Sequence, residues 1–358
     1  GTGAGAITFT ATALANTNYN QAVTSTLIVI GKSTPVLIIT SANTMSVDGT
    51  LTATVTTTAS QSIGTLIYSI INNTGSAIVD ANTGIITAFS AGAITLTVTS
   101  LGNSNYNSVS VGQLITIGQG TPTLSVTSAN TMVVDGTLTA TVTTTASQSI
   151  GTLIYSVINN TGSAIVDANT GIITAFSAGT ITLTATSLGN SNYNSSSVDQ
   201  LITIGQGTPT LSVTSANMLN VGDGITATVN TTATYGRGGA ITFSIFAGSG
   251  SATVDTNLGV LTAIGAGTVT LIASSSGDGD YNPASTSQLL TINKGTPILS
   301  ITSSTTNVAV GGSLSLSATS QAPGILPITG AITFGIISTS GSGSATINPS
   351  TGLITALG

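Results

Sequence analysis

The stretch SAIVDANTGIITAFSAGAITLTVTS, which runs from Ser76 to Ser100, decides the fold of this chain. Near its end Ile94, Leu96 and Val98 alternate with threonines, and a period of two residues predicts a strand that is buried on one face. The string VDANTG within the stretch predicts a tight turn, because an aspartate side chain can accept backbone N–H bonds from two residues on and glycine permits positive φ. We therefore expect short strands joined by specific turns.

The same pattern returns along the chain with a regular period. A tyrosine recurs at intervals of 87, 87 and 88 residues, as Tyr19, Tyr106, Tyr193 and Tyr281. Self-similarity at a fixed period indicates tandem domains. We interpret the chain as the C-terminal strands of a preceding repeat at 1–33, complete repeats at 34–120, 121–207 and 208–295, and a truncated repeat at 296–358.

Each repeat has the pattern of a two-sheet β-sandwich. Besides the alternating segments at 51–55 and 94–98, we expect strands at 37–40, 66–71, 76–79, 84–89 and 113–117. About seven strands per repeat is typical of such a sandwich. No shorter internal period points to a β-solenoid. The expected fold class is therefore all-β.

The linkers between repeats are very short. Gly205-Gln206-Gly207 leads through Thr208-Pro209 into the next strand. Proline fixes its own φ and holds the preceding residue in an extended conformation. We therefore expect semi-rigid joints, with the domains in an elongated row and neighbours touching mainly near the linkers.

The residue composition argues against several functional classes. The chain has no cysteine, histidine or tryptophan, and its only basic residues are Lys32, Arg237 and Lys294. Zinc sites need cysteine or histidine ligands, and nucleophilic triads need a histidine or lysine base, whereas Lys32 and Lys294 lie in the linkers between repeats. We therefore expect no enzyme and no cofactor. The formal net charge of −6 leaves no basic surface for phosphates, so we expect no nucleic-acid partner.

The apolar segments are too short for membrane insertion. The mean hydropathy is +0.51, yet no apolar run approaches the roughly 20 residues of a spanning helix. The chain opens at Gly1 inside one repeat and closes at Gly358 inside another. We therefore expect a segment of a longer polypeptide with no membrane insertion of its own.

Aspartates are the only acidic side chains, and two of them are candidates for binding calcium. Asp278 and Asp280 lie in the string GDGDYN, whereas the matching loop of the first repeat has Asn103 and Asn105. Calcium needs six to eight oxygen ligands, and two carboxylates supply only part of that set. Loop stabilisation is the alternative for this pair, and turn stabilisation is what we expect for Asp80, Asp167 and Asp255.

The recurring tyrosine admits two interpretations. Tyr106 and its equivalents could stack on a ligand of an adhesive protein, or they could pack near the end of the sandwich. Regular recurrence once per repeat favours packing.

At Ser76–Ser100 the chain resembles the group 2 bacterial immunoglobulin-like repeats, with a Val-Asp turn, a glycine, an apolar strand and Ala-Gly before a threonine-rich strand. The strings NSNYN around Tyr106 and GDGDYNPAS at 277–285 resemble the loop before the last strand in related repeats. The resemblance extends along nearly the whole chain. It implies immunoglobulin-like β-sandwiches of giant exported surface adhesins, similar to those of gliding or biofilm-forming Bacteroidetes. The family's core aromatic stands here as Tyr68, Tyr155, Phe243 and Phe334.

These observations predict an extracellular stalk at the cell surface. We expect the repeats to belong to a large secreted adhesin, in which they extend and display a distal module. Its partners would be anchoring or secretion machinery outside this segment, and surface glycans or the substratum. Two alternatives remain: the repeats themselves bind glycans or partner proteins, or an open sheet edge accepts a strand from another chain and builds a fibre. The first two complete repeats differ at nine scattered positions, which favours the stalk.

Overall fold

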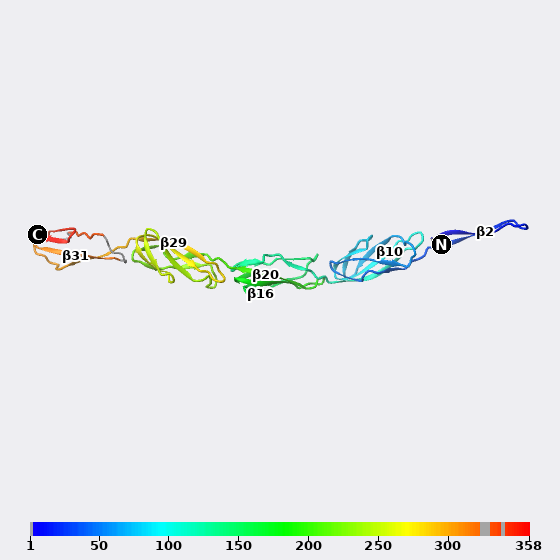
Figure 1. Ribbon diagram of the computed structural model, residues 1–358, viewed down its shortest axis with the longest axis horizontal. Coiled ribbons are helices and arrows are strands. Elements are labelled where there is room, and N and C mark those ends of the chain that lie inside the picture. The colour runs from blue at the N-terminus through cyan, green and yellow to red at the C-terminus, as the bar shows by residue number, and fades with distance from the viewer. Residues whose placement is uncertain (1–2, 323–329, 338–340) are drawn as a thin grey trace. The chain divides into compact units, whose positions relative to one another are not determined.

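The computed structural model describes residues 3–322, 330–337 and 341–358. Over these residues the regular secondary structure consists of strands, numbered β1 to β33, several of which are labelled in Figure 1. None of the described residues belongs to a helix that is long and apolar enough to cross a membrane.

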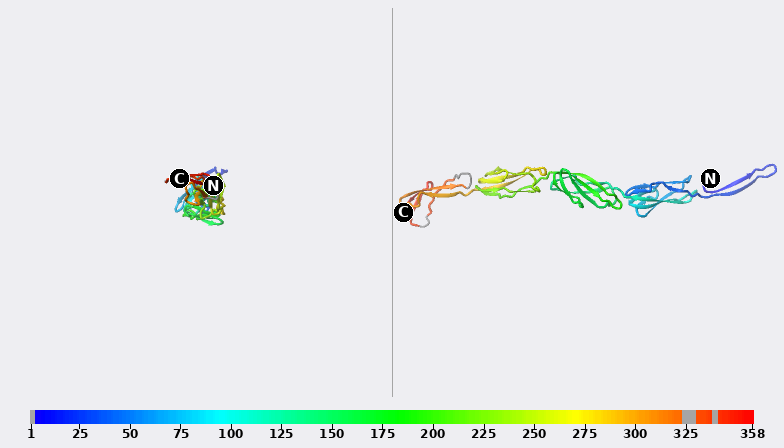
Figure 2. Two further views of the ribbon diagram at one scale, coloured as in Figure 1. Left: turned by 90° about the vertical axis from the view of Figure 1, so that its left-hand side faces the viewer. Right: turned by 90° about the horizontal axis from the view of Figure 1, so that it is seen from below.

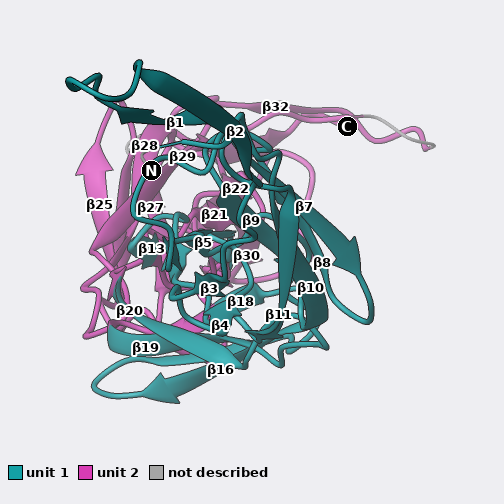
Figure 3. Ribbon diagram, turned by 90° about the vertical axis from the view of Figure 1, so that its right-hand side faces the viewer, with its two compact units in different colours: residues 1–132, 137–174, 180–203 teal, residues 133–136, 175–179, 204–358 magenta. Residues whose placement is uncertain are grey.

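The chain divides into two compact units, coloured separately in Figure 3. The first unit holds Gly1–Met132, Thr137–Thr174 and Thr180–Thr203, and the second holds Val133–Gly136, Ala175–Gly179 and Ile204–Gly358. Residues 34–120 therefore lie within the first unit, and residues 208–295 lie within the second.

The first repeat, residues 34–120, folds into a two-layer sandwich. Its strands are β3 (Leu37–Ile39), β4 (Thr44–Ser46), β5 (Thr50–Thr52), β6 (Val55–Thr57), β7 (Leu66–Asn72), β8 (Ser76–Val79), β9 (Ile85–Ser90), β10 (Gly92–Ser100) and β11 (Val109–Gly118). One sheet has the order β4-β11-β10-β7, with β4 parallel to β11, and the other strands pair as β5-β9-β8 and β3-β6. In immunoglobulin lettering, one layer holds strands A′, G, F and C, and the other layer holds strands A, B, E and D. This is the division of an immunoglobulin-like sandwich.

The third repeat, residues 208–295, has the same architecture. Its strands are β21 (Leu211–Val213), β22 (Met218–Asn220), β23 (Gly224–Thr226), β24 (Val229–Thr231), β25 (Ile241–Ala247), β26 (Ser251–Val254), β27 (Val260–Gly265), β28 (Gly267–Ser275) and β29 (Ala284–Asn293). They pair as β22-β29-β28-β25, β23-β27-β26 and β21-β24. One strand plan therefore serves two sequences that have diverged.

The second repeat, residues 121–207, contributes the corresponding strands. They are β12 (Leu124–Val126), β13 (Thr131–Val133), β14 (Thr137–Thr139), β15 (Val142–Thr144), β16 (Leu153–Asn159), β17 (Ser163–Val166), β18 (Ile172–Ser177), β19 (Gly179–Ser187) and β20 (Ser196–Gly205). Its sheet orders are β13-β20-β19-β16, β14-β18-β17 and β12-β15. The fold is thus all-β, a tandem of immunoglobulin-like β-sandwiches.

The segments before and after the complete repeats carry fewer strands. β1 (Gly5–Ala13) and β2 (Ala22–Ile30) form a two-stranded hairpin, drawn in blue in Figures 1 and 2. Residues 296–358 contain β30 (Ile298–Ser303), β31 (Ser313–Gln321), β32 (Ala345–Ile347) and β33 (Leu353–Ala356), in the order β30-β31-β33-β32.

The core of the first repeat lies between its two layers. On β10, Ile94, Leu96 and Val98 are fully buried, and the threonines between them face the other way and are half-buried. Ile86 and Ala88 on β9, which belongs to the opposite layer, are fully buried as well. The alternation predicted from the sequence is confirmed, and it selects the side chains that hold the layers together by burying apolar surface.

The segment predicted as one strand at 51–55 forms two strands, β5 and β6. β5 pairs with β9, whereas β6 pairs with β3. Between them the N–H of Ala53 donates to the carbonyl of Gly84 (2.9 Å), and the N–H of Thr40 donates to the carbonyl of Thr54 (2.8 Å). The chain changes pairing partner at this point. The predicted count of about seven strands per repeat was too low for this reason, and because the three-residue β4 was missed.

The VDANTG turn forms as its residue types predict. Oδ1 of Asp80 accepts hydrogen bonds from the N–H groups of Asn82 (2.9 Å) and Thr83 (2.8 Å). Gly84 has a φ of 72°, and a Cβ placed on it would lie 2.9 Å from a ring carbon of Tyr68. Glycine is therefore required twice, by the backbone conformation and by the ring of the core aromatic packed against it.

Candidate functional site

The linker ahead of each complete repeat is hydrogen-bonded to a loop of that repeat. We call residues 103–107, 190–194 and 278–282 the tyrosine loops, because each contains the recurring tyrosine. The N–H of Gly120 donates to the carbonyl of Asn192 (2.9 Å), and the N–H of Asn194 donates to the carbonyl of Gly120 (2.8 Å). The same parallel bridge joins Ser33 to Tyr106, Gly120 to Tyr193 and Gly207 to Tyr281. The linker is thereby held as a short extra strand.

A turn of the first repeat contacts the tyrosine loop of the second. We call residues 46–49 and their counterparts 133–136 the aspartate turns. Oδ2 of Asp48 accepts a hydrogen bond from Oη of Tyr193 (2.8 Å), and Oδ1 accepts one from Oγ of Ser147 (2.5 Å). The Tyr193 side chain is only 1% exposed. One carboxylate therefore bonds two side chains of the following repeat.

The next junction repeats this arrangement with a divergent partner. Oδ2 of Asp135 accepts from Oη of Tyr281 (2.5 Å), and Oδ1 accepts from Oγ1 of Thr234 (2.7 Å). Tyr281 is 2% exposed. Threonine stands where the previous junction has serine, so both junctions present a phenol and an aliphatic hydroxyl to the carboxylate.

Aspartate adopts a left-handed backbone conformation in these turns. Asp48 and Asp135 each have a φ of 63°, a region in which residues with a Cβ are disfavoured by about 1 kcal/mol or more. The matching residues of the two later repeats are Gly222 (φ 95°) and Gly311 (φ 75°). Glycine suits this conformation better, so the backbone does not explain the aspartate. The hydrogen bonds that the aspartate side chain makes to the following repeat explain its presence.

The carboxyl group of Asp48 is an acid strengthened by its partners. Partial burial works to raise its pKa, but the hydrogen bonds from Ser147 and Tyr193 outweigh that effect, and the pKa is lowered from its usual value. Asp48 is therefore ionised at neutral pH. Hydrogen bonds to an ionised acceptor are stronger than those between neutral groups.

A second bond crosses each junction beside the tyrosine. The residue just before the tyrosine accepts a hydrogen bond from the backbone N–H of the alanine that directly precedes β1, β10 or β19. Oδ1 of Asn105 accepts from the N–H of Ala4 (2.9 Å), and Oδ1 of Asn192 accepts from the N–H of Ala91 (3.1 Å). Oδ1 of Asp280 accepts from the N–H of Ala178 (2.7 Å). At the two later junctions the tyrosine loop thus bonds the preceding repeat at two neighbouring positions, through the tyrosine and through the residue before it.

The structure brings the calcium candidates Asp278 and Asp280 into the junction between the second and third repeats. Oδ1 of Asp278 accepts from the N–H groups of Asp280 (2.8 Å) and Tyr281 (2.9 Å), and Oδ2 accepts from the N–H of Gly238 (2.7 Å). The bond from Gly238, followed by that from Asp280, lowers the pKa of Asp278. Among the described residues no three metal-ligating side chains cluster together. Calcium binding by this pair stays a prediction.

Asp280 is paired with the one arginine of the chain. Nη1 of Arg237 lies 3.0 Å from Oδ2 of Asp280 and also donates to the carbonyl of Phe176 (2.5 Å). The guanidinium sits 5.8 Å from the ring centre of Tyr235, whose edge meets the ring of Phe176 at 6.2 Å. Sequence reasoning missed this cluster. The available signal was the extra residue that lengthens the third repeat, which falls in this loop.

The recurring tyrosines divide into three environments. Tyr193 and Tyr281 are buried near the end of the sandwich, which confirms the packing interpretation for them, although the sequence did not indicate that the partner is the preceding repeat. Tyr106 is half-buried. Tyr19, in the loop of the β1–β2 hairpin, is 74% exposed. Burial of the tyrosine therefore goes together with the presence of an aspartate turn.

No protein-family model matches the sequence, and no curated protein is significantly similar to it. Among solved structures, the protocadherin gammaB7 EC3–6 cis-dimer covers 89% of this chain, with 91% of its own chain, 14% identity and a TM-score of 0.25. The Escherichia coli adhesin FdeC covers 73%, with 98% of its own chain, 16% identity and a TM-score of 0.26.

A surface-layer protein is similar in the same way. Domains 1–6 of the surface layer protein SbsC cover 99% of this chain, with 53% of their own chain, 13% identity and a TM-score of 0.28. At these identities and scores, the likeness carries nothing about a ligand or a partner.

Proposed function

We propose that this chain is a non-enzymatic stalk segment of a large cell-surface adhesin, in which serially coupled repeats extend and display another part of the protein. The observation that carries the proposal is the recurring junction. A buried tyrosine of one repeat bonds an aspartate of the repeat before it, as Tyr193 does with Asp48 and Tyr281 with Asp135. A junction that recurs between neighbouring repeats couples them in series, which is what a stalk requires.

The junction suits a spacer because it restricts the linker. A free glycine linker would let neighbouring domains reorient, since glycine populates many backbone conformations. Here the linker glycine is a bridge partner of the tyrosine loop, and a Cβ on Gly120 would lie 3.0 Å from the carbonyl oxygen of Val47 and 3.4 Å from the ring of Tyr193. The linker lies against both neighbours and has little freedom to bend.

The composition supports a surface location and a mechanical role. The outward positions of the strands carry threonine, which favours β-structure and tolerates water. With no histidine or cysteine, the chain lacks imidazole bases, thiol nucleophiles and the ligands of zinc-type sites. We place the stalk outside the cell, with anchoring or secretion machinery elsewhere in the polypeptide, and a gliding or biofilm-forming bacterium is the host that the resemblance suggests.

Distances between spin labels test the coupling directly. The chain has no cysteine, so Asn82→Cys with Asn169→Cys gives two unique label sites in equivalent exposed turns of the first two repeats. We expect a narrow distance distribution by double electron–electron resonance, and a broader one after Asp48→Gly or Tyr193→Ala. A broad distribution in the unmodified background would contradict the proposal, because independent repeats make no semi-rigid stalk.

A further inference from the structure

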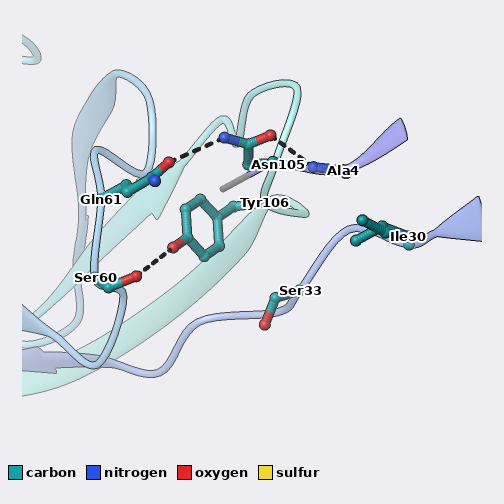
Figure 4. A pocket seen from close by; sticks show the side chains of 9 residues that line it. Ala4, Ile30, Ser33, Ser60, Gln61, Asn105 and Tyr106 are labelled. Atoms are coloured by element: carbon teal, nitrogen blue, oxygen red, sulfur yellow. Dashed lines mark hydrogen bonds between the residues drawn. The ribbon is translucent and has the colours of Figure 1, made fainter. Parts of the chain in front are cut away.

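A pocket lies at the end of the first repeat where the β1–β2 hairpin meets it. Its cavity of about 160 Å³ is lined by Tyr106, Asn105, Ser60, Ser33 and Ala4, among others. Figure 4 shows the Tyr106 hydroxyl pointing toward Ser60, and Asn105 reaching toward Ala4. The Tyr106 and Ser60 oxygens lie 3.5 Å apart.

The same two residue positions hold a carboxylate at both later junctions. Ser60 corresponds to Ser147, and Tyr106 corresponds to Tyr193, each 87 residues further on. At that junction the phenol and the hydroxyl each donate to a carboxylate oxygen of Asp48. The pocket at Tyr106 therefore has the donor pair of an occupied aspartate site.

The rest of this junction is already assembled. The N–H of Ala4 donates to Oδ1 of Asn105 (2.9 Å), as Ala91 does at the next junction, and Ser33 bridges Tyr106 as Gly120 bridges Tyr193. The hairpin thus takes the place that the last two strands of a repeat take elsewhere. These bonds hold the hairpin beside the tyrosine loop of the first repeat.

The inward face of the hairpin lacks the rest of a sandwich. Ile7, Phe9 and Ile28 are 51%, 60% and 44% exposed. Their equivalents 87 residues later are Ile94, Leu96 and Ile115, all fully buried. Apolar side chains in this pattern suit packing against an opposing sheet. In every complete repeat the first strand of that sheet directly follows the aspartate-turn position.

We propose that the pocket around Tyr106 binds the ionised aspartate of a Val-Asp-Gly turn, supplied in the same polypeptide by the repeat to which the β1–β2 hairpin belongs. The proposal rests on the proposed function, since it extends the same coupling to one more junction. The ligand chemistry is specific. A carboxylate accepts from both hydroxyl groups, whereas the Gly-Gly turn at Gly311 has no side chain to offer them.

The test adds the missing part of that repeat to the chain and measures the accessibility of Tyr106. Residues 34–90 are added directly before Ala4, because Ala4 is equivalent to Ala91, and the added copy supplies its own Val-Asp-Gly turn. Tetranitromethane nitration, mapped residue by residue with mass spectrometry, reports the accessibility of each tyrosine. We expect nitration of Tyr106 to fall to the level of buried Tyr193, while Tyr235, at 73% exposure, stays reactive as the internal standard.

A matched variant isolates the carboxylate. Asp48→Asn in the added copy alone should restore much of the Tyr106 reactivity, while the original Asp48 keeps Tyr193 protected. Full protection by the asparagine copy would overturn the proposal, because the pocket would then select shape and not charge. Unchanged Tyr106 reactivity in the extended chain would overturn it as well.

Two further readouts separate the alternatives. Concentration-dependent protection of Tyr106 in the original chain would assign the pocket to a second copy and would overturn the occupant proposed here. In the extended chain, a reactive Tyr106 beside protected Tyr193 and Tyr281 would refute this inference and leave the stalk coupling intact. Reactivity at all three tyrosines would refute the stalk coupling itself.

Discussion

The side chains of Asp48 and Tyr193 meet although they lie 145 residues apart in the sequence. The tyrosine ring supplies buried apolar surface, and its hydroxyl supplies one donor. The aspartate supplies an acceptor from a backbone conformation that glycine adopts more readily. Each residue is unremarkable within its own repeat, and its role becomes visible only across the junction.

Removing either partner should loosen the first junction by a similar amount. We expect Tyr193→Phe and Asp48→Asn each to lower the free energy of opening around Gly120 and Asn194 by about 1 kcal/mol, since the site is partly exposed to solvent. The double substitution should cost less than the sum of the two single ones, because both act on the same bond between Tyr193 and Asp48. Amide hydrogen exchange measures this opening, with Asp80→Asn as a control remote from the junction. Strict additivity would show that the two side chains do not interact.

Acid should weaken the same junction. The pKa of Asp48 is lowered in the folded chain, so its contribution is complete above the unfolded value of about 3.9 and is lost as the pH falls through the folded value. We expect exchange at Gly120 to be constant between neutral pH and about pH 5, after correction for the intrinsic rate, and to rise below about pH 4. In Asp48→Asn this acid response should disappear. A response that persists in the variant would point to other carboxylates.

At the scale of elements, the turn between β8 and β9 has the most restrictive geometry. Gly84 closes it with positive φ, and the ring of Tyr68 occupies the space that a Cβ on Gly84 would need. The hydrogen bonds of Asp80 hold the other side of the turn and lower the pKa of that carboxyl, first through the N–H of Thr83 and then through that of Asn82. The strands on both sides depend on this register.

Gly84→Ala should therefore destabilise the first repeat strongly. The methyl group would enter the ring space of Tyr68, at 2.9 Å from a ring carbon, and the left-handed backbone would become strained. We expect a loss of about 2–4 kcal/mol in the unfolding free energy of this repeat, from strain and overpacking together. Gly112→Ala is the control, because its nearest neighbour lies 3.6 Å away in ordinary contact. Denaturant titration should leave the control near the parent value, and equal losses in both would contradict the turn argument.

At the scale of the whole molecule, the first question is whether metal ions contribute to stability. Asp278 and Asp280 receive protein donors at several oxygens, and Asp280 is paired with Arg237. We expect the melting temperature to be the same in EDTA and in calcium, because a ligand stabilises only where it binds the folded state. A clear rise with calcium that is lost in Asp278→Asn would restore the calcium interpretation of this loop.

The repeat boundaries give a second test at this scale. A fragment of residues 121–207 holds every strand of one sandwich and should fold alone with a cooperative denaturant transition. A fragment of the same length at 162–248 joins the last strands of one sandwich to the first strands of the next. It should aggregate or stay unfolded, because both parts leave an apolar face and unpaired edges in water. Equal cooperativity in the two fragments would show that the boundaries are misplaced.

Local residue patterns were sufficient for the repeat period, the strand type and the turn chemistry. Alternation at Ile94, Leu96 and Val98 depends on neighbours in the same strand, and the Asp80 turn closes within six residues, so both can be recognised without knowing the partner strand. Charge and composition likewise need no fold. The elongated row and the distal module stay predictions.

Tertiary structure alone determined the strand partners and the junction. β4 is too short to show a pattern, and it exists because β11 lies beside it. The break between β5 and β6 arises where the chain stops pairing with β9 and begins to pair with β3. No residue pattern at 51–57 indicates this change of partner. The bond between Asp48 and Tyr193 arises only when two separately folded sandwiches meet. Contacts of this kind depend on long-range geometry, and a sequence pattern records only what happens within a few residues.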